Sequence, residues 1–222
     1  MIITYWSDFA CPYCYIGIAR MNRVIRELGG QNKVTFERKS FQLRKPGSYG
    51  TCPTCGDLKE KLSGTNSSHF AAKYKMSESQ AAEQFSQMSR MGAEEGLEIN
   101  YATAPLCYTE DAHRLVKFAE EHGGDAVASL VSETLFYMYL TQNYDISDQR
   151  ILLGIAKGVG LDEQETINML TSDDYGANVQ MDSMKADMLG IHVVPYFLLD
   201  GKYYIEGVQS DEYIREALKA LL

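Results

Sequence analysis

Two cysteines three positions apart, Cys11 and Cys14, follow a short apolar run at the start of the chain. The run, residues 2–6, is typical of a strand. Downstream, apolar side chains recur at i, i+3, i+4 and i+7 and are followed by two glycines, which predicts a helix and its end; they are Met21, Val24, Ile25 and Leu28. A dithiol where a strand gives way to a helix strongly restricts the possible folds.

The helix pattern predicts a chemical difference between the two thiols. Cys11 lies at or just before the first turn, and Pro12 suits the first helical position, where an N–H would have no partner. Unpaired N–H groups and the positive end of the helix dipole stabilise a thiolate and lower its pKa. We therefore expect Cys11 to be the nucleophile and the more shielded Cys14 to be the resolving thiol. Two alternatives remain at this stage, half of a zinc site or two buried cysteines without chemistry.

A second informative stretch lies far along the chain, at residues 190–199. It is typical of a helix end followed by a strand, with Val194 and Pro195 near the start of the strand. Proline is tolerated at such a position, and X–Pro is the peptide bond that adopts the cis form at low cost.

The combination of CPYC after a first strand with Val–Pro before a later one resembles the thioredoxin superfamily. In that superfamily a cis-proline loop faces the CxxC and docks the substrate backbone. Three segments resemble the DsbA-like oxidoreductases of the FrnE branch, whose fold is related to 2-hydroxychromene-2-carboxylate isomerase and kappa-class glutathione transferase: SDFACPYCYIG, GLEINYATAPLCYTEDAHRL and GIHVVPYFLLDGKYYIEGVQS. The resemblance implies an α/β thioredoxin fold with a large all-helical insertion, and substrate contacts from Pro12, Tyr13, Val194 and Pro195.

The remaining patterns predict the order of elements. A second strand is expected around residues 34–41, helices throughout residues 68–170, and a helix, two strands and a helix after that. Asp200 and Gly201 predict a two-residue hairpin turn, and the expected helix N-caps are Thr109, Ser147 and Asp162. We therefore predict a discontinuous thioredoxin-like domain, residues 1–45 and 173–222, with a loop and helical insertion domain over residues 46–172.

Composition limits the classes of partner. The 222 residues are 45% hydrophobic, enough for a substantial core, and the net charge of −9 argues against nucleic-acid binding. No basic tract favours a membrane surface, and no apolar run approaches the roughly 18–20 residues of a membrane span. Since no cleavable leader precedes the first strand, we expect a cytoplasmic protein, where cysteine pairs are more often catalytic or metal-binding than structural.

A second CxxC, Cys52 and Cys55, lies in a stretch rich in glycine, serine, threonine and proline. It lacks a flanking strand and helix, so three hypotheses remain: an accessory redox pair, half of a metal site, or an incidental pair. A complete zinc site would need two further ligands. The fifth cysteine, Cys107, is interpreted as a packed small hydrophobe.

Proton transfer to or from Cys14 needs a nearby acceptor. Asp8 is the closest carboxylate in sequence, and it is either that acceptor or a solvated residue at the end of the strand. His113 is interpreted as a hydrogen-bonded structural histidine rather than a catalytic base.

The sequence thus predicts an enzyme that exchanges disulfides on a protein or small molecule through Cys11 and Cys14, with no bound cofactor and glutathione as a conceivable co-substrate. One rival is a glutathione transferase or cis–trans isomerase of the kappa or hydroxychromene type, which typically carries serine at the position of Cys11. The other is a non-catalytic metal-binding module. The Pro–Tyr dipeptide between the two cysteines matches that of glutaredoxins, whose reduction potentials are roughly −200 to −230 mV, whereas the strongly oxidising DsbA has a potential of about −120 mV. The intervening dipeptide alone does not fix the direction of exchange, the substrate, the recycling partner or the oligomeric state.

Overall fold

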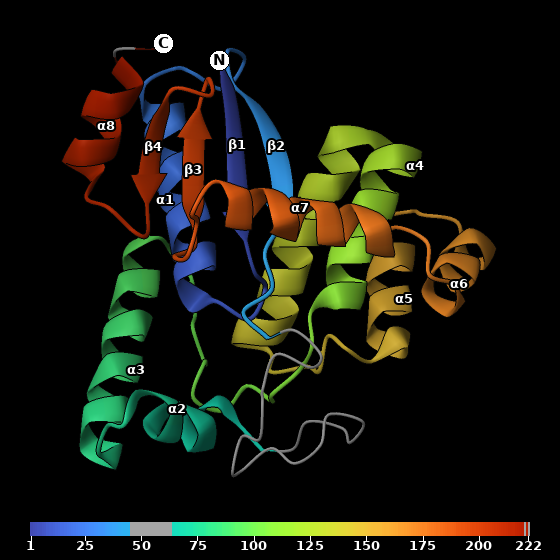
Figure 1. Cartoon of the computed structure of the whole chain (residues 1–222), viewed down its shortest axis with the longest axis horizontal. Helices are drawn as coiled ribbons and strands as arrows, with labels where there is room; N and C mark the ends of the chain where they lie inside the picture. The colour runs from blue at the N-terminus through green and yellow to red at the C-terminus, as the bar shows by residue number, and fades with distance from the viewer. Residues whose placement is uncertain (45–63, 220, 222) are drawn as a thin grey trace.

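The computed structural model describes residues 1–44, 64–219 and 221. Two strands lie near the start of the chain and two near its end, with helices α2–α7 between these pairs, α1 between the first two strands and α8 after the last (Figure 1). In chain order the elements are β1 (Ile2–Ser7), α1 (Pro12–Glu27), β2 (Thr35–Ser40), α2 (Asn66–Tyr74), α3 (Glu78–Glu94), α4 (Glu110–Phe136), the π-helical turn η1 (Tyr137–Thr141), α5 (Gln149–Gly158), α6 (Glu163–Thr171), α7 (Gly176–Met188), β3 (Tyr196–Leu199), β4 (Tyr203–Glu206) and α8 (Asp211–Lys219).

The described strands form one sheet in the order β2-β1-β3-β4. β1 pairs in parallel with β2 and antiparallel with β3, and β3 pairs antiparallel with β4. The parallel β1–β2 pair requires a crossover, which α1 supplies, and the antiparallel β3–β4 pair needs only a tight turn. This mixed α/β arrangement confirms the predicted fold class.

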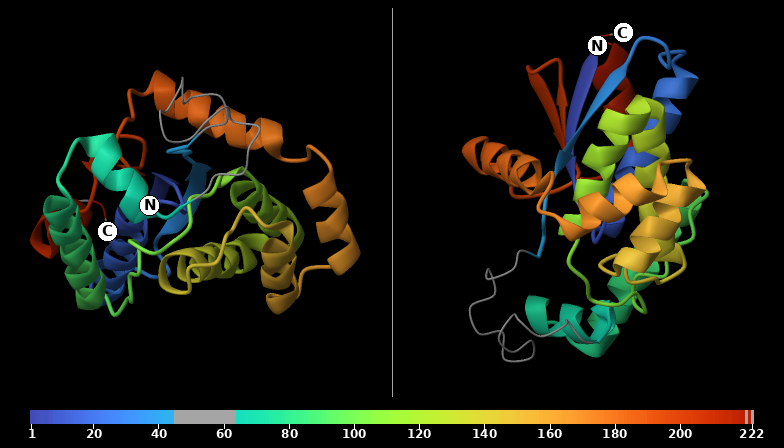
Figure 2. Two further views of the ribbon diagram at one scale, coloured as in Figure 1. Left: turned by 90° about the horizontal axis from the view of Figure 1, so that it is seen from below. Right: turned by 90° about the vertical axis from the view of Figure 1, so that its right-hand side faces the viewer.

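Helices cover both faces of the sheet (Figure 2). Alternate residues of β1 point to opposite faces, so Ile3 and Tyr5 join the core under α1 and α8. On the other face the indole Nε1 of Trp6 donates to the carbonyl oxygen of Asp182 in α7, at 3.1 Å. Because β1 is buried on both sides, its carboxyl end, where the first cysteine lies, is held rigidly.

The α2–α3 pair is tied to α1 by buried charge. The Glu95 carboxylate, 1% exposed, accepts from Nε of Arg20 at 2.6 Å and from Nε of Arg23 at 2.9 Å. Arg23 also reaches Asp211 at the start of α8. These ion pairs fix the end of α3 against the helix that carries the cysteines.

Several sequence predictions need correction. The helices are not continuous over residues 68–170, because residues 95–109 form turns and extended segments around Gly96, which has φ 74°, and Pro105. Thr109 precedes α4, but its side chain makes no capping hydrogen bond. The cap of α5 is Asp148 rather than Ser147, whose N–H and hydroxyl instead donate to the Asp145 carboxylate.

The predicted cap at Asp162 is confirmed, whereas the predicted two-residue hairpin is one residue too short. Asp162 caps α6 as expected, since its carboxylate accepts from the N–H of Glu165 at 2.8 Å. The β3–β4 hairpin has Asp200 and Gly201 at positive φ, but Leu199 pairs with Tyr203, so Lys202 extends the connection to three residues.

Candidate active site

Cys11 is the N-cap of α1, as the sequence predicts. Its backbone is extended, with φ −106° and ψ 110°, and Pro12 follows at the first helical position. The first turn of α1 contains no acidic residue, so no carboxylate within that turn opposes the positive end of the helix dipole at the sulfur. Cys11 is 6% exposed and Cys14 is fully buried one turn further on, and both are free thiols.

The second predicted segment lies against this turn. The Cys11 thiol donates to the carbonyl oxygen of Val194, with 3.7 Å between sulfur and oxygen, across 183 residues of sequence. The Val194–Pro195 peptide bond is cis. Pro12, Val194 and Pro195 are buried and Tyr13 is half-buried, and the hydrogen bond from Cys11 to Val194 brings the two predicted segments together.

Gly17 makes this approach possible, and sequence reasoning missed it. A Cβ atom at Gly17 would lie 2.7 Å from the Cγ atom of Pro195, closer than two carbon atoms can pack. The ring of Pro195 therefore occupies the space that a side chain at position 17 of α1 would fill. The signal in the sequence was a glycine six positions after Cys11 in the middle of a predicted helix.

Asp8 is fully buried, so the interpretation as a solvated strand-end residue is wrong. Its carboxylate accepts from the N–H of Ala10 at 3.1 Å and of Leu43 at 2.6 Å, and lies 3.7 Å from Nε2 of His113. Burial raises the pKa of Asp8, but the interaction with His113 and the two N–H donors outweigh it and lower the pKa. Asp8 is thus held as a carboxylate three residues before Cys11.

His113 connects the helical insertion to this loop. It is buried in α4, and its Nε2 atom also lies 3.1 Å from the carbonyl oxygen of Phe41. The ring of Phe9 packs between His113 and Phe136, with centroids at 4.7 and 4.8 Å. The role expected for His113, a hydrogen-bonded side chain in a packed site, matches these contacts.

Burial keeps the thiols of Cys14 and Cys107 protonated. Burial raises the pKa of Cys14 well above its usual value, and its hydrogen bond to Cys11 and the charge there raise it further. Burial also raises the pKa of Cys107, to about 12, and this thiol is 1% exposed in the main core. A protonated Cys14 beside Cys11 suits a resolving thiol, whereas Cys107 packs as a small hydrophobe.

The remaining features considered from the sequence are the second CxxC pair, a metal site and a membrane-spanning segment. Cys52 and Cys55 lie outside the described residues. Within the described ranges, no three or more His, Cys, Asp or Glu side chains are grouped to hold a metal ion. The described helices include none long and apolar enough to cross a membrane.

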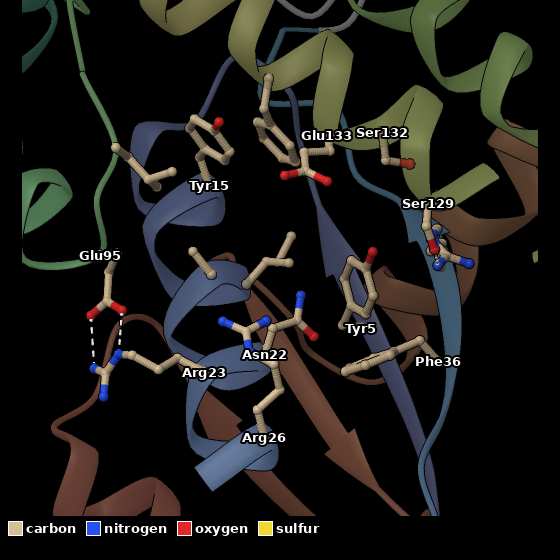
Figure 3. A pocket seen from close by; sticks show the side chains of 15 residues that line it. Tyr5, Tyr15, Asn22, Arg23, Arg26, Phe36, Glu95, Ser129, Ser132 and Glu133 are labelled. Carbon is tan, nitrogen blue, oxygen red and sulfur yellow. Dashed lines mark hydrogen bonds and ion pairs between the residues drawn. The ribbon is translucent and has the colours of Figure 1, made fainter. Parts of the chain in front are cut away.

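A cavity of about 440 Å³ lies on the other side of α1, between this helix, the sheet and α4 (Figure 3). Tyr5, Tyr15 and Glu133 point toward it, and the Arg23–Glu95 ion pair lies at its edge. Neither thiol of the CPYC segment lines it, so this cavity takes no part in the geometry around the sulfur atoms.

The model of the DSBA-like thioredoxin domain matches residues 2–219 of the chain. The chain belongs to the DsbA-like thioredoxin family. Members of this family are oxidoreductases or isomerases, which supports an enzyme, and the match spans both the strands and the helices between them.

Similar proteins within and around the family include both activities. A probable DsbA oxidoreductase, SCO1869 of Streptomyces coelicolor, has a solved structure that is 29% identical with a TM-score of 0.86, covering 99% of this chain and 89% of that one. YwbO of Bacillus subtilis, described as uncharacterized, is 25% identical over 97% of this chain and 94% of its own. The structure of 2-hydroxychromene-2-carboxylate isomerase has a TM-score of 0.71 over 100% of this chain and 96% of that one, but at 15% identity it shows the fold alone.

Proposed function

We propose that this protein is a thiol–disulfide oxidoreductase in which Cys11 attacks substrate disulfides and Cys14 resolves the mixed disulfide. The observation that carries the proposal is the Cys11 sulfur at the N-terminus of α1, 3.7 Å from the Val194 carbonyl oxygen and beside Pro195. A nucleophile at a helix N-terminus facing an extended backbone segment can both bind a peptide-like disulfide and react with it.

The exchange has two balanced steps. The Cys11 thiolate attacks one sulfur of the substrate, the substrate S–S bond breaks, and the leaving thiolate takes up a proton. Cys14 then loses its proton and attacks Cys11, which releases the second substrate thiol and leaves a Cys11–Cys14 disulfide. Two molecules of a low-molecular-weight thiol then supply the two electrons and two protons that return the pair to the dithiol form, and they leave as their own disulfide.

Asp8 is the proposed proton acceptor for Cys14. Its backbone N–H also hydrogen-bonds Cys14, so the two residues are neighbours. The surrounding donors hold Asp8 as a carboxylate, so we propose that it takes the proton only transiently, as the Cys14 sulfur transfers its charge to the forming S–S bond. The FrnE branch, the cytoplasmic location and a role for glutathione as co-substrate remain predictions.

A Cys14→Ser variant tests the proposal. With a disulfide substrate it should accumulate a mixed disulfide on Cys11, detected by intact mass, and lose steady-state turnover. Cys11→Ser should form no adduct, and Cys107→Ala, a matched change at a buried thiol outside the site, should turn over like wild type. Undiminished glutathione conjugation or isomerisation by Cys14→Ser, without disulfide turnover by wild type, would refute the proposal and favour the kappa-type alternative.

A further inference from the structure

One buried cation, which interacts electrostatically with Asp8 and Cys107, has only part of its hydrogen-bonding capacity used. Arg44 follows β2 and is 8% exposed, and its Nη2 atom donates to Oδ1 of Asn66 at 2.7 Å. Its Nη1 atom is also buried and makes no hydrogen bond within 3.5 Å to a described residue, although the Tyr101 side chain lies close enough to interact with the guanidinium. A buried charged N–H without a partner is costly and is therefore rare unless a ligand or water satisfies it.

The guanidinium is held so that it cannot easily turn toward another partner. The Nδ2 atom of Asn66 donates to the hydroxyl of Tyr139 at 2.9 Å, and that hydroxyl donates to the carbonyl oxygen of Pro105 at 2.9 Å. This chain fixes the amide orientation of Asn66, since its oxygen must face Arg44. The direction of the unpaired Nη1 group is fixed in turn.

Arg44 lines a small cavity of about 30 Å³. That volume admits a head group such as a carboxylate, or one or two waters, rather than a whole ligand. None of the described residues that line it is acidic, and these residues are Leu43, Arg44, Asn66, His69, Phe70, Lys73, Tyr74 and Tyr101. Burial lowers the pKa of His69, and the charges of Arg44 and Lys73 lower it further, so the cavity is a positive environment that favours an anion.

Neither thiol of the CPYC segment lines this cavity, but its walls are linked to the site around Cys11 by a hydrogen bond and by electrostatic interaction. The N–H of Leu43, the residue before Arg44, donates to the Asp8 carboxylate at 2.6 Å. Burial raises the pKa of Tyr101, and a charge on Cys11 raises it further, so this wall of the cavity lies within electrostatic range of the thiolate. The pKa of Tyr13 is likewise raised by burial and by charges on Cys11 and Tyr74.

We propose that Arg44 binds a carboxylate of the substrate through its free Nη1 group, so that the enzyme prefers small disulfides that carry a carboxylate a few bonds from the sulfur. This inference rests on the proposed exchange function and names the substrate class for it. Arg44 would act as a specificity residue, because it holds the end of the substrate while Cys11 attacks the sulfur.

Three disulfides that share an ethylene spacer and differ in charge test the proposal: dithiodipropionate, bis(hydroxyethyl) disulfide and cystamine. For wild type we expect kcat/KM to fall in that order. A charge-assisted hydrogen bond predicts a preference of about 10- to 100-fold for the anionic over the neutral disulfide. In Arg44→Met this ratio should collapse toward one, while turnover of the neutral disulfide changes less than about threefold. Arg26→Met removes one charge from an exposed position on α1 and should leave the ratio unchanged.

A second measurement needs only wild type and covers a failure of Arg44→Met to fold. Suberate, the sulfur-free analogue of dithiodipropionate, should compete with bis(hydroxyethyl) disulfide, whereas the neutral analogue hexanediol should not. Equal inhibition by the two, or equal charge ratios in wild type and Arg44→Met, would overturn the inference and leave a water-filled structural cavity. If wild type turned over none of the three disulfides, the proposed function itself would fail.

Discussion

Replacing Gly17 by alanine tests whether the contact between α1 and Pro195 controls reactivity. The added methyl would lie 2.7 Å from Cγ of Pro195 and 3.6 Å from Cγ2 of Val208. Carbon atoms pack at about 3.5–4.0 Å, so the proline must retreat by about 1 Å. Both helix and loop are buried here, and the displacement therefore moves Pro195 away from Cys11 rather than into open space.

The expected effects on stability and activity differ in size. Overpacking costs about 1–3 kcal/mol, and alanine gains about 0.5–1 kcal/mol over glycine inside a helix, so the net loss is about 0–2.5 kcal/mol. A domain with the usual stability of about 5–15 kcal/mol stays folded. A displacement of about 1 Å in a substrate-positioning group costs about 100-fold in rate, which is about 2.7 kcal/mol of barrier.

The assay measures kcat/KM with bis(hydroxyethyl) disulfide and the urea unfolding curve of the same preparations. Gly154→Ala is the matched control, because Gly154 lies inside α5 with nothing within 4 Å of an added Cβ atom. It should gain about 0.5–1 kcal/mol and keep its activity. If Gly17→Ala retained more than half of the wild-type kcat/KM, or if Gly154→Ala lost as much as Gly17→Ala, the steric reasoning would be refuted.

Three further predictions concern charge and burial. Glu95→Gln should destabilise the protein by about 2–4 kcal/mol in urea unfolding, because it removes a buried carboxylate shared by Arg20 and Arg23 and leaves them only more exposed acidic partners, whereas Glu94→Gln, at a side chain that is 66% exposed, should change stability by less than about 0.5 kcal/mol. The folded state lowers the pKa of Asp8, so its stabilising contribution is present above the unfolded-state pKa of about 3.9 and is lost as pH falls through the lower folded value; Asp8→Asn should flatten that acid limb of the urea midpoint against pH. Because burial raises the pKa of Cys107 to about 12, iodoacetamide at neutral pH should leave it unmodified until urea unfolds the chain, as peptide mass mapping would show; rapid labelling of native protein would contradict this.

Local patterns were sufficient for the elements around the thiols. The spacing of Met21, Val24, Ile25 and Leu28 placed α1, and the proline after Cys11 placed its first turn. The helix boundaries within the insertion were less accurate, because residues 95–109 owe their turns partly to contacts with distant chain. The N–H of Asn100, for example, donates to the carbonyl oxygen of Leu140 at 2.7 Å.

The site was predictable only where a residue carries its own chemical signal. Cys11, Cys14 and Pro195 stand out by type and spacing, whereas Asp8 looked equally like a solvated residue. Its burial depends on His113 from α4 and Leu43 after β2, which are 105 and 35 residues away. No local pattern reports such contacts.

The sequence by itself determined a strand, a dithiol and a helix in that order, because hydrophobic periodicity and helix-capping chemistry act over a few residues. The tertiary structure decided that Val194 reaches the Cys11 sulfur, that Gly17 leaves room for Pro195, and that Arg44 is buried with one N–H group unpaired. Each of these depends on close packing between segments far apart in the chain, and packing distances are set by the whole fold rather than by neighbours in sequence.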